Sequence, residues 1–269
     1  MTHVANTLEQ TQTLSLVPAP IELSIAQLDA HTLLDQDRAA LMTRVDDKFV
    51  IHKHNLESLL HSMVSDYSVL EDRDIRKFDY KTIYYDTGDY ELYHQHHSGK
   101  ANRLKVRTRE YVQSKICFLE IKEKNNKGIT HKYRHNIGNT NHHLHVNKIW
   151  EQKDKNKPLI ACLEVNYQRI TLLHKTLNQR VTIDINLSFH DLINNGNKLL
   201  DDIAIIEVKR DKADHALKNS KLHKLLKEFG YFPKTFSKYC MGCVLTKVPN
   251  IKTNRFKFNY LSLKKLLSN

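Results

Sequence analysis

The sequence of 269 residues contains little glycine, proline, cysteine or tryptophan. Seven glycines and five prolines exclude collagen-like repeats and Gly/Pro-rich low-complexity chains. The four cysteines form no disulfide framework, which indicates a reducing compartment. Cys240 and Cys243 form a Cys-x-x-Cys pair with no second pair nearby, and we interpret them as buried thiols. No run approaches the roughly 18 apolar residues of a membrane-spanning helix, and residues 1–10 lack signal-peptide features, so we expect a cytoplasmic protein.

Acidic residues are in the minority. The chain has 42 Lys and Arg against 30 Asp and Glu, a formal net charge of +12, while 40% of its residues are apolar. That apolar content is enough for a buried core, and the charge indicates an anionic partner. Nucleic acid, an acidic membrane surface and phosphorylated small molecules all fit this charge, so the positions of the cations must decide between them.

The periodicity of apolar residues predicts one α+β domain dominated by strands. Helical spacing is expected over Ile25–Met42 and Leu56–Val64, around Tyr90 and Tyr93, and from Leu217 to Phe229. We divide the chain into a disordered arm (1–20), one folded domain (21–248) and a basic C-terminal tail (249–269). The predicted strands are Arg44–His52, Lys81–Asp86, Ala101–Val112, Lys115–Lys124, Gly128–Ile137, Ala161–Leu173, Arg180–Ser188 and Asp202–Arg210.

Cations gather on one face of these strands, because side chains alternate between the two faces of a sheet. The first set is Arg103, Lys105, Arg107 and Arg109, opposite Leu104, Val106 and Thr108. The same face is expected to carry Glu120, Lys122, Lys132, Arg134, Arg180, Asp184, Asn186, Glu207 and Lys209, with Val181, Ile183, Ile185 and Leu187 opposite. Like charges on neighbouring strands repel, so this face indicates a bound polyanion. The pattern predicts a closed antiparallel β-barrel with an ionic lumen and helices packed outside.

Four carboxylates accompany the cations: Asp46, Glu120, Asp184 and Glu207. Mg²⁺ or Mn²⁺ held by one or two carboxylates and by phosphate oxygens is the usual arrangement for phosphoryl transfer. Ion pairing with neighbouring cations is the alternative interpretation. We favour Glu207 as a ligand over Glu120 and Asp184, and place Asp46 last.

Eight short motifs, in this order, resemble the polyphosphate polymerase domain of the vacuolar transporter chaperone (VTC) family, within the CYTH or triphosphate tunnel metalloenzyme superfamily. The motifs are Arg44-Val-Asp46-Asp-Lys48-Phe49, Tyr84-Tyr85-Asp86-Thr87, Arg107-Thr-Arg109-Glu-Tyr111, Phe118-Leu-Glu120-Ile-Lys122, Lys132-Tyr-Arg134, Tyr167-Gln-Arg169, Ile206-Glu207-Val-Lys209 and Ser237-Lys238-Tyr239. The resemblance spans roughly residues 40 to 245 and implies a tunnel of eight antiparallel strands.

The resemblance also implies an activity and the residues that perform it. ATP would bind in the tunnel and donate its terminal phosphoryl group to a growing polyphosphate chain, with Mn²⁺ or Mg²⁺ held by Glu207. The residues that match the family's phosphate-contacting set are Lys48, Arg107, Arg109, Lys122, Lys132, Arg169, Arg180, Ser237 and Lys238. Arg103, Lys105, Arg134 and Lys209 are expected to assist, because they share the basic face. Asp46 departs from the family, which more often has Glu there, and the spacing around Lys234 leaves that residue unassigned.

Two other activities fit the same basic face. A tunnel hydrolase that cleaves inorganic or nucleoside triphosphate would need the same clamp and a positioned water. A non-catalytic binder of polyphosphate or RNA would need no metal, but only Tyr111 and Tyr133 lie near the cations, which disfavours nucleic acid. We expect a stand-alone catalytic domain whose oligomeric state the sequence leaves open. A separate membrane protein, or the tail cations Lys252, Arg255, Lys257, Lys264 and Lys265, could bring it to acidic lipid; the alternative is a solvated tail.

Overall fold

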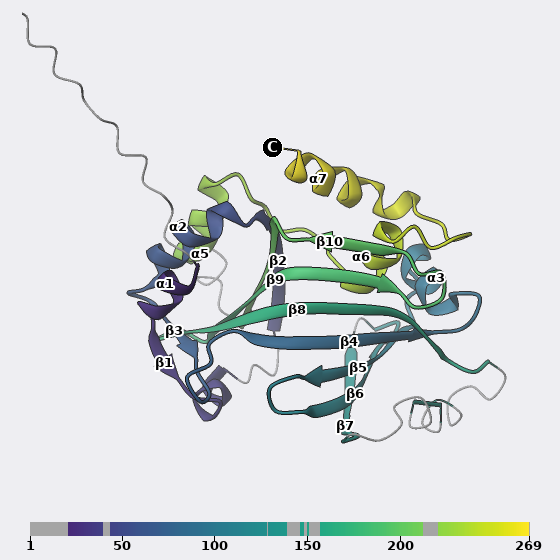
Figure 1. Ribbon diagram of the computed structural model, residues 1–269, viewed down its shortest axis with the longest axis horizontal. Coiled ribbons are helices and arrows are strands. Elements are labelled where there is room, and N and C mark those ends of the chain that lie inside the picture. Colours follow the sequence, from purple (N-terminus) through teal and green to yellow (C-terminus); the bar gives the residue numbers. More distant parts are fainter. Residues whose placement is uncertain are drawn as a thin grey trace, which may run out of the picture.

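The fold is an eleven-stranded sheet flanked by helices, as the computed structural model shows (Figure 1). The structure describes residues 21–39, 44–127, 129–138, 146, 147, 150, 157–211 and 220–268. The expected arm, residues 1–20, lies outside the described residues. The strands are β1 (Asp29–His31), β2 (Arg44–His52), β3 (Tyr67–Leu70), β4 (Phe78–Asp86), β5 (Arg103–Tyr111), β6 (Ile116–Lys124), β7 (Thr130–Asn136), β8 (Ile160–His174), β9 (Gln179–Asp191), β10 (Asn197–Leu200) and β11 (Ile203–Asp211).

The main path of the sheet has the order β2-β11-β9-β8-β4-β5-β6-β7, and all of its neighbours are antiparallel. These eight strands correspond to the eight predicted from the sequence. Within the described residues β2 and β7 are not paired with each other, and every residue of β7 is exposed. The predicted closure into a barrel is therefore not confirmed: the sheet is open between its two end strands.

Helices form two groups (Figure 1). The first contains α1 (Ile21–Ala26), α2 (His54–Met63) and α5 (Lys221–Glu228). The second contains α3 (Glu91–Ser98), α6 (Lys238–Leu245), α7 (Lys257–Leu267) and the 3-10 helix η3 (Asn254–Phe256), while the 3-10 helix η1 (Leu34–Ala39) follows β1. The first group covers the outer face of the sheet, where Leu56, Leu60 and Leu226 share one core with Phe49 and Ile183. This group lies outside the sheet, as predicted from the sequence.

α6 lies instead on the inner face of the sheet. Its Tyr239, Met241 and Cys243 are buried in a second core with Leu163 and Ile205, which stand on the same strand faces as Arg169 and Glu207. Nearly all of α6 is apolar and buried, so the helix is part of the core rather than an outer layer. It fills one end of the inner face. The four cysteines are all buried as free thiols.

A bulge in β9 changes which side chains face inward. Asn186 adopts a φ of 53°, and the register against β8 shifts between Asn166 and Gln168, so that β9 holds one extra residue. Leu187 consequently faces the inner core rather than the outer one. The side chain of Asn186 binds Lys53 and Gln168, and none of the three lines the cavity described below. Uninterrupted alternation, as the sequence suggested, places both residues on the wrong face.

Two other segments differ from the expectation or add to it. The helix expected over Ile25–Met42 is wrong in its described part, because the helix ends at Ala26 and Asp29–His31 pairs in parallel with β3. The segment expected as a basic tail contains η3 and α7, and Leu263 of α7 is buried in the inner core.

Candidate functional site

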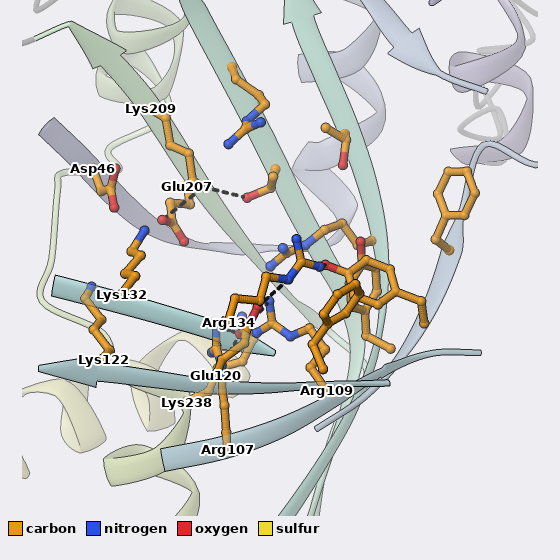
Figure 2. Close-up of a pocket in the computed structure, with 18 of the residues that line it drawn as sticks. Asp46, Arg107, Arg109, Glu120, Lys122, Lys132, Arg134, Glu207, Lys209 and Lys238 are labelled. Atoms are coloured by element: carbon orange, nitrogen blue, oxygen red, sulfur yellow. Dashed lines mark hydrogen bonds and ion pairs between the residues drawn. The ribbon is translucent and has the colours of Figure 1, made fainter. Parts of the chain in front are cut away.

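A cavity of about 790 Å³ occupies the inner face of the sheet beyond the N-terminus of α6. Figure 2 shows side chains of β2 and β11 meeting those of β6 and β7 across it. Eleven Lys and Arg side chains and four carboxylates line it. The lining includes the predicted residues Asp46, Lys48, Lys105, Arg107, Arg109, Glu120, Lys122, Lys132, Arg134, Arg169, Arg180, Glu207, Lys209, Ser237 and Lys238.

Two predicted residues do not line the cavity. Asp184 is buried behind the lining, and Arg103 lies at the start of β5, where its guanidinium donates to the carbonyl of Lys100. The sequence pattern placed Arg103 with the other cations because it shares their strand face. The cavity ends before that position.

Glu207 sits between two lysines on the β2–β11 side. Its Oε2 lies 2.7 Å from Lys48 Nζ, and its Oε1 lies 2.9 Å from Lys209 Nζ. Burial alone would raise the pKa of Glu207, but Lys209 and Lys48 outweigh it and hold the pKa well below its usual range. Burial lowers the pKa of Lys209 to about 8, although Glu207 opposes that change. The charge of Lys209 therefore changes nearer to neutral pH than the charge of an ordinary lysine does.

Glu120 is the centre of an arginine cluster on β5, β6 and β7. Arg107 donates to its Oε2 from Nε at 2.7 Å and lies 2.6 Å from it through a second nitrogen. Arg109 and Arg134 approach the same carboxylate at 3.8 and 3.7 Å. Burial acts to raise the pKa of Glu120, but Arg107 and Arg109 lower it to about 2. Three guanidinium groups are thus held together by one carboxylate.

Asp184 organises a third set of cations. Arg169 binds it through two nitrogens, at 2.6 and 2.9 Å, and Lys238 from α6 binds its Oδ2. Burial acts to raise the pKa of Asp184, but Arg169 and Lys238 lower it below its usual range. Both carboxylate oxygens therefore already hold cations, and Asp184 positions Arg169 and Lys238 toward the cavity.

The remaining lysines stand where α6 meets the cavity. Lys105 donates to Ser237 Oγ at 3.1 Å, and the same oxygen accepts the backbone N–H of Cys240 as the N-cap of α6. Burial lowers the pKa of Lys105, and repulsion from Arg107 adds to this. Burial, followed by repulsion from Lys105, lowers the pKa of Lys122, although Asp46 opposes the change. The inner face thus lacks internal carboxylates to match all of its cations, as expected for a site that binds an anion.

Aromatic rings form a layer beneath the cations, which the alternation of charges did not predict. Arg169 lies over the rings of Tyr80 and Tyr167, at 5.1 and 5.3 Å, and Lys238 lies 4.7 Å from the centre of Tyr167. Cation–π contact fixes a cation without neutralising it. Tyr167 stands in one of the quoted motifs, whereas no motif contained Tyr80.

The donor set fits a divalent metal that arrives with phosphate. No group of three or more His, Cys, Asp or Glu that could hold a metal lies within the described residues. Mg²⁺ and Mn²⁺ need only one or two protein carboxylates when phosphate oxygens and water complete the shell. Glu207 and Asp46 lie on the same side of the cavity (Figure 2). Glu207 is held by two lysines, whereas Glu120 and Asp184 are each held by arginine.

Fold and site together define an antiparallel sheet whose inner face gathers more cations than carboxylates in one cavity. The chain belongs to the VTC domain family, whose model matches residues 43–247. Expectation and comparison agree on this family.

The solved structures that are similar to this chain have low sequence identity to it. A candidate adenylate cyclase from Vibrio parahaemolyticus is 16% identical, covers 75% of this chain and 98% of its own, and has a TM-score of 0.45. A candidate adenylate cyclase from Bacillus halodurans is 11% identical over 73% and 96%, with a TM-score of 0.45. A candidate adenylyl cyclase from Hippeastrum, described with a dominant triphosphatase activity, is 12% identical over 75% and 96%, with a TM-score of 0.44. A comparison with curated protein sequences gave no match.

None of the helices in the described part of the chain has the length and apolar character that crossing a bilayer requires.

Proposed function

We propose that this protein is a metal-dependent polyphosphate polymerase that transfers the terminal phosphoryl group of ATP to a growing polyphosphate chain. The observation that carries the proposal is the excess of cations in one cavity. Eleven Lys and Arg side chains line it against four carboxylates, more positive charge than a single triphosphate neutralises. A site that holds donor and polymer together requires such an excess.

In this proposal, different cations contact different phosphates. Arg107 and Arg109 lie two residues apart on β5, about 7 Å along the strand, a spacing that suits adjacent phosphates. Arg169, which lies over the ring of Tyr80 as Arg109 does, and Lys238 beside it would neutralise the phosphoryl group in transfer. In phosphoryl transfer the protein contributes mainly positioning and charge neutralisation.

Mn²⁺ or Mg²⁺ is the proposed cofactor, with Glu207 as its principal carboxylate and Asp46 beside it. Bound there, the metal would neutralise phosphate oxygens and polarise the group transferred. Glu207 holds Lys48 and Lys209 when it holds no metal. Metal binding to Glu207 would release both ammonium groups toward the phosphates.

Chain-length analysis tests the proposal. Purified protein with ATP and Mn²⁺ should give polymers that lengthen with time on a gel, and Arg109→Ala should reduce the yield by about a hundredfold or more. Lys198→Ala is the matched control, because Lys198 is exposed on β10 outside the cavity lining. Orthophosphate without chain growth would instead make the protein a hydrolase. Binding of polyphosphate without any turnover would make it a binding module.

A further inference from the structure

α7 presents an exposed face that combines apolar and cationic side chains. Phe258 is 73% exposed and Leu261 is 50% exposed, three positions apart and therefore on the same side of the helix. Lys257, Lys264 and Lys265 are exposed around them. The opposite side of α7 is packed, with Leu263 buried in the inner core. The exposed face is thus a fixed surface of the fold.

The sequence around α7 contains no acid that could neutralise these lysines. Glu228 is the last acidic residue of the chain, so every charged side chain after it is a cation. The three α7 lysines have no salt-bridge partner among the described residues. The face therefore fits an anionic surface.

We propose that α7 docks on the surface of a bilayer that contains anionic phospholipid. Phe258 and Leu261 would enter the boundary between headgroups and acyl chains, while Lys257, Lys264 and Lys265 contact lipid phosphates. Two apolar side chains on one convex helix offer far less than the roughly 800 Å² per partner of a stable protein interface. A bilayer needs no complementary pocket, so it fits this face better than an acidic protein does.

The docking would hold the cavity close to the membrane. Asn259 of α7 donates to the carbonyl of Thr235 at 2.7 Å, and Ser237 and Lys238 of the cavity lining follow two and three residues later in the chain. This proposal is independent of the reaction in the cavity. A protein without polymerase activity would dock in the same way.

Co-sedimentation with vesicles tests the proposal in the full chain. The vesicles are phosphatidylcholine alone, or phosphatidylcholine with about one third phosphatidylserine. Excess tripolyphosphate is present throughout, so that the cavity cannot bind lipid phosphate. The protein should sediment with the anionic vesicles only, and added salt should release it. Replacing Lys257, Lys264 and Lys265 by Gln should lower the partition by about fivefold for each lysine, up to about a hundredfold together.

Phe258→Ser should weaken docking on the same vesicles without loss of charge. The matched control replaces Lys224 and Lys227 of α5 by Gln, and Phe229, which follows α5, by Ser; all three side chains are exposed. Unchanged tripolyphosphate binding by each variant shows that it has folded.

Four results would overturn the proposal. They are no sedimentation of the wild type, equal sedimentation with neutral vesicles, unchanged binding by the α7 variants, and an equal loss in the α5 control. A Phe258→Trp variant gives a second reading, since Trp150 is the chain's one tryptophan and is buried. Its emission should shift to the blue with anionic vesicles and remain unchanged with neutral ones.

Discussion

Replacing Asp184 by Asn should destabilise the empty protein, and bound tripolyphosphate should restore much of the loss. Asp184 has a 2% exposed side chain, and the side chains of its partners Arg169 and Lys238 are 14% and 13% exposed. Asn keeps the volume but removes the charge that both cations face. Both cations then remain largely buried without their carboxylate. Removing one partner of a buried ion pair in this way is strongly destabilising, because the remaining charge is left uncompensated.

The size of the loss follows from this burial. Removing one partner of a buried pair costs about 3–5 kcal/mol, and the partial exposure of both cations places the value near the lower end. For a protein of this size each kcal/mol corresponds to about 2–4 °C in the melting temperature. The empty Asp184→Asn protein should therefore melt about 6–12 °C below the wild type. The same substitution makes the cavity more positive by one charge.

Thermal unfolding followed by circular dichroism, with and without tripolyphosphate, is the assay. Saturating ligand at about a thousand times its dissociation constant stabilises a protein by about 4 kcal/mol. The variant should gain more than the wild type, because phosphate takes the place of the missing carboxylate, and the difference in melting temperature should shrink by about half or more. Glu164→Gln is the control: its partner Lys81 is 44% exposed, so it should cost less than about 1 kcal/mol. An equal difference with and without ligand would refute the placement of phosphate at Arg169 and Lys238.

Three further predictions concern the metal, the pH dependence and the inner core. Glu207→Gln should move the Mn²⁺ dependence of turnover to higher concentration, by about tenfold or more; normal turnover with an unshifted curve would remove Glu207 from the metal site. Because the pKa of Lys209 is about 8 and phosphate binds its protonated form, tripolyphosphate affinity by calorimetry should fall as the pH rises above 8, by up to about tenfold per unit. Proton uptake should accompany binding there, and a flat profile would contradict this account. Gly242→Ala should destabilise the protein by about 1–3 kcal/mol in urea unfolding, since the new Cβ would lie 2.5 Å from Leu163 Cδ2; Gly88→Ala, with nothing within 4 Å, is its control.

Alternation of side chains predicted the strands and most of the cavity lining. β2 has the predicted bounds, and the predicted cations of β5, β6 and β7 other than Arg103 line one cavity. The prediction works because each of these strands separates a charged face from an apolar one along most of its length. The strands that were missed, β1, β3 and β10, are three or four residues long, too short to show a period.

Features that depend on contacts between distant segments could not be predicted. α6 packs on the inner face against Leu163 of β8 and Ile205 of β11. On each of these strands the same face carries charged residues at one end and apolar residues at the other, which the sequence pattern did not reveal. The bulge at Asn186 depends on a positive φ, which Asn tolerates but does not dictate. The ion pairs of the carboxylates are a further example, because the sequence does not show that Glu120 contacts Arg107 or that Asp184 contacts Arg169.

The position of α6 also sets the order in which the site is completed during synthesis. The strands of the inner face end at Asp211, whereas Ser237 and Lys238 come more than twenty residues later. A nascent chain released before α6 would leave Leu163, Phe189 and Ile205 exposed to water on the inner face, an apolar surface prone to association. One late segment therefore adds Lys238 to the cavity and covers this apolar surface, and a chain interrupted before α6 would lack both.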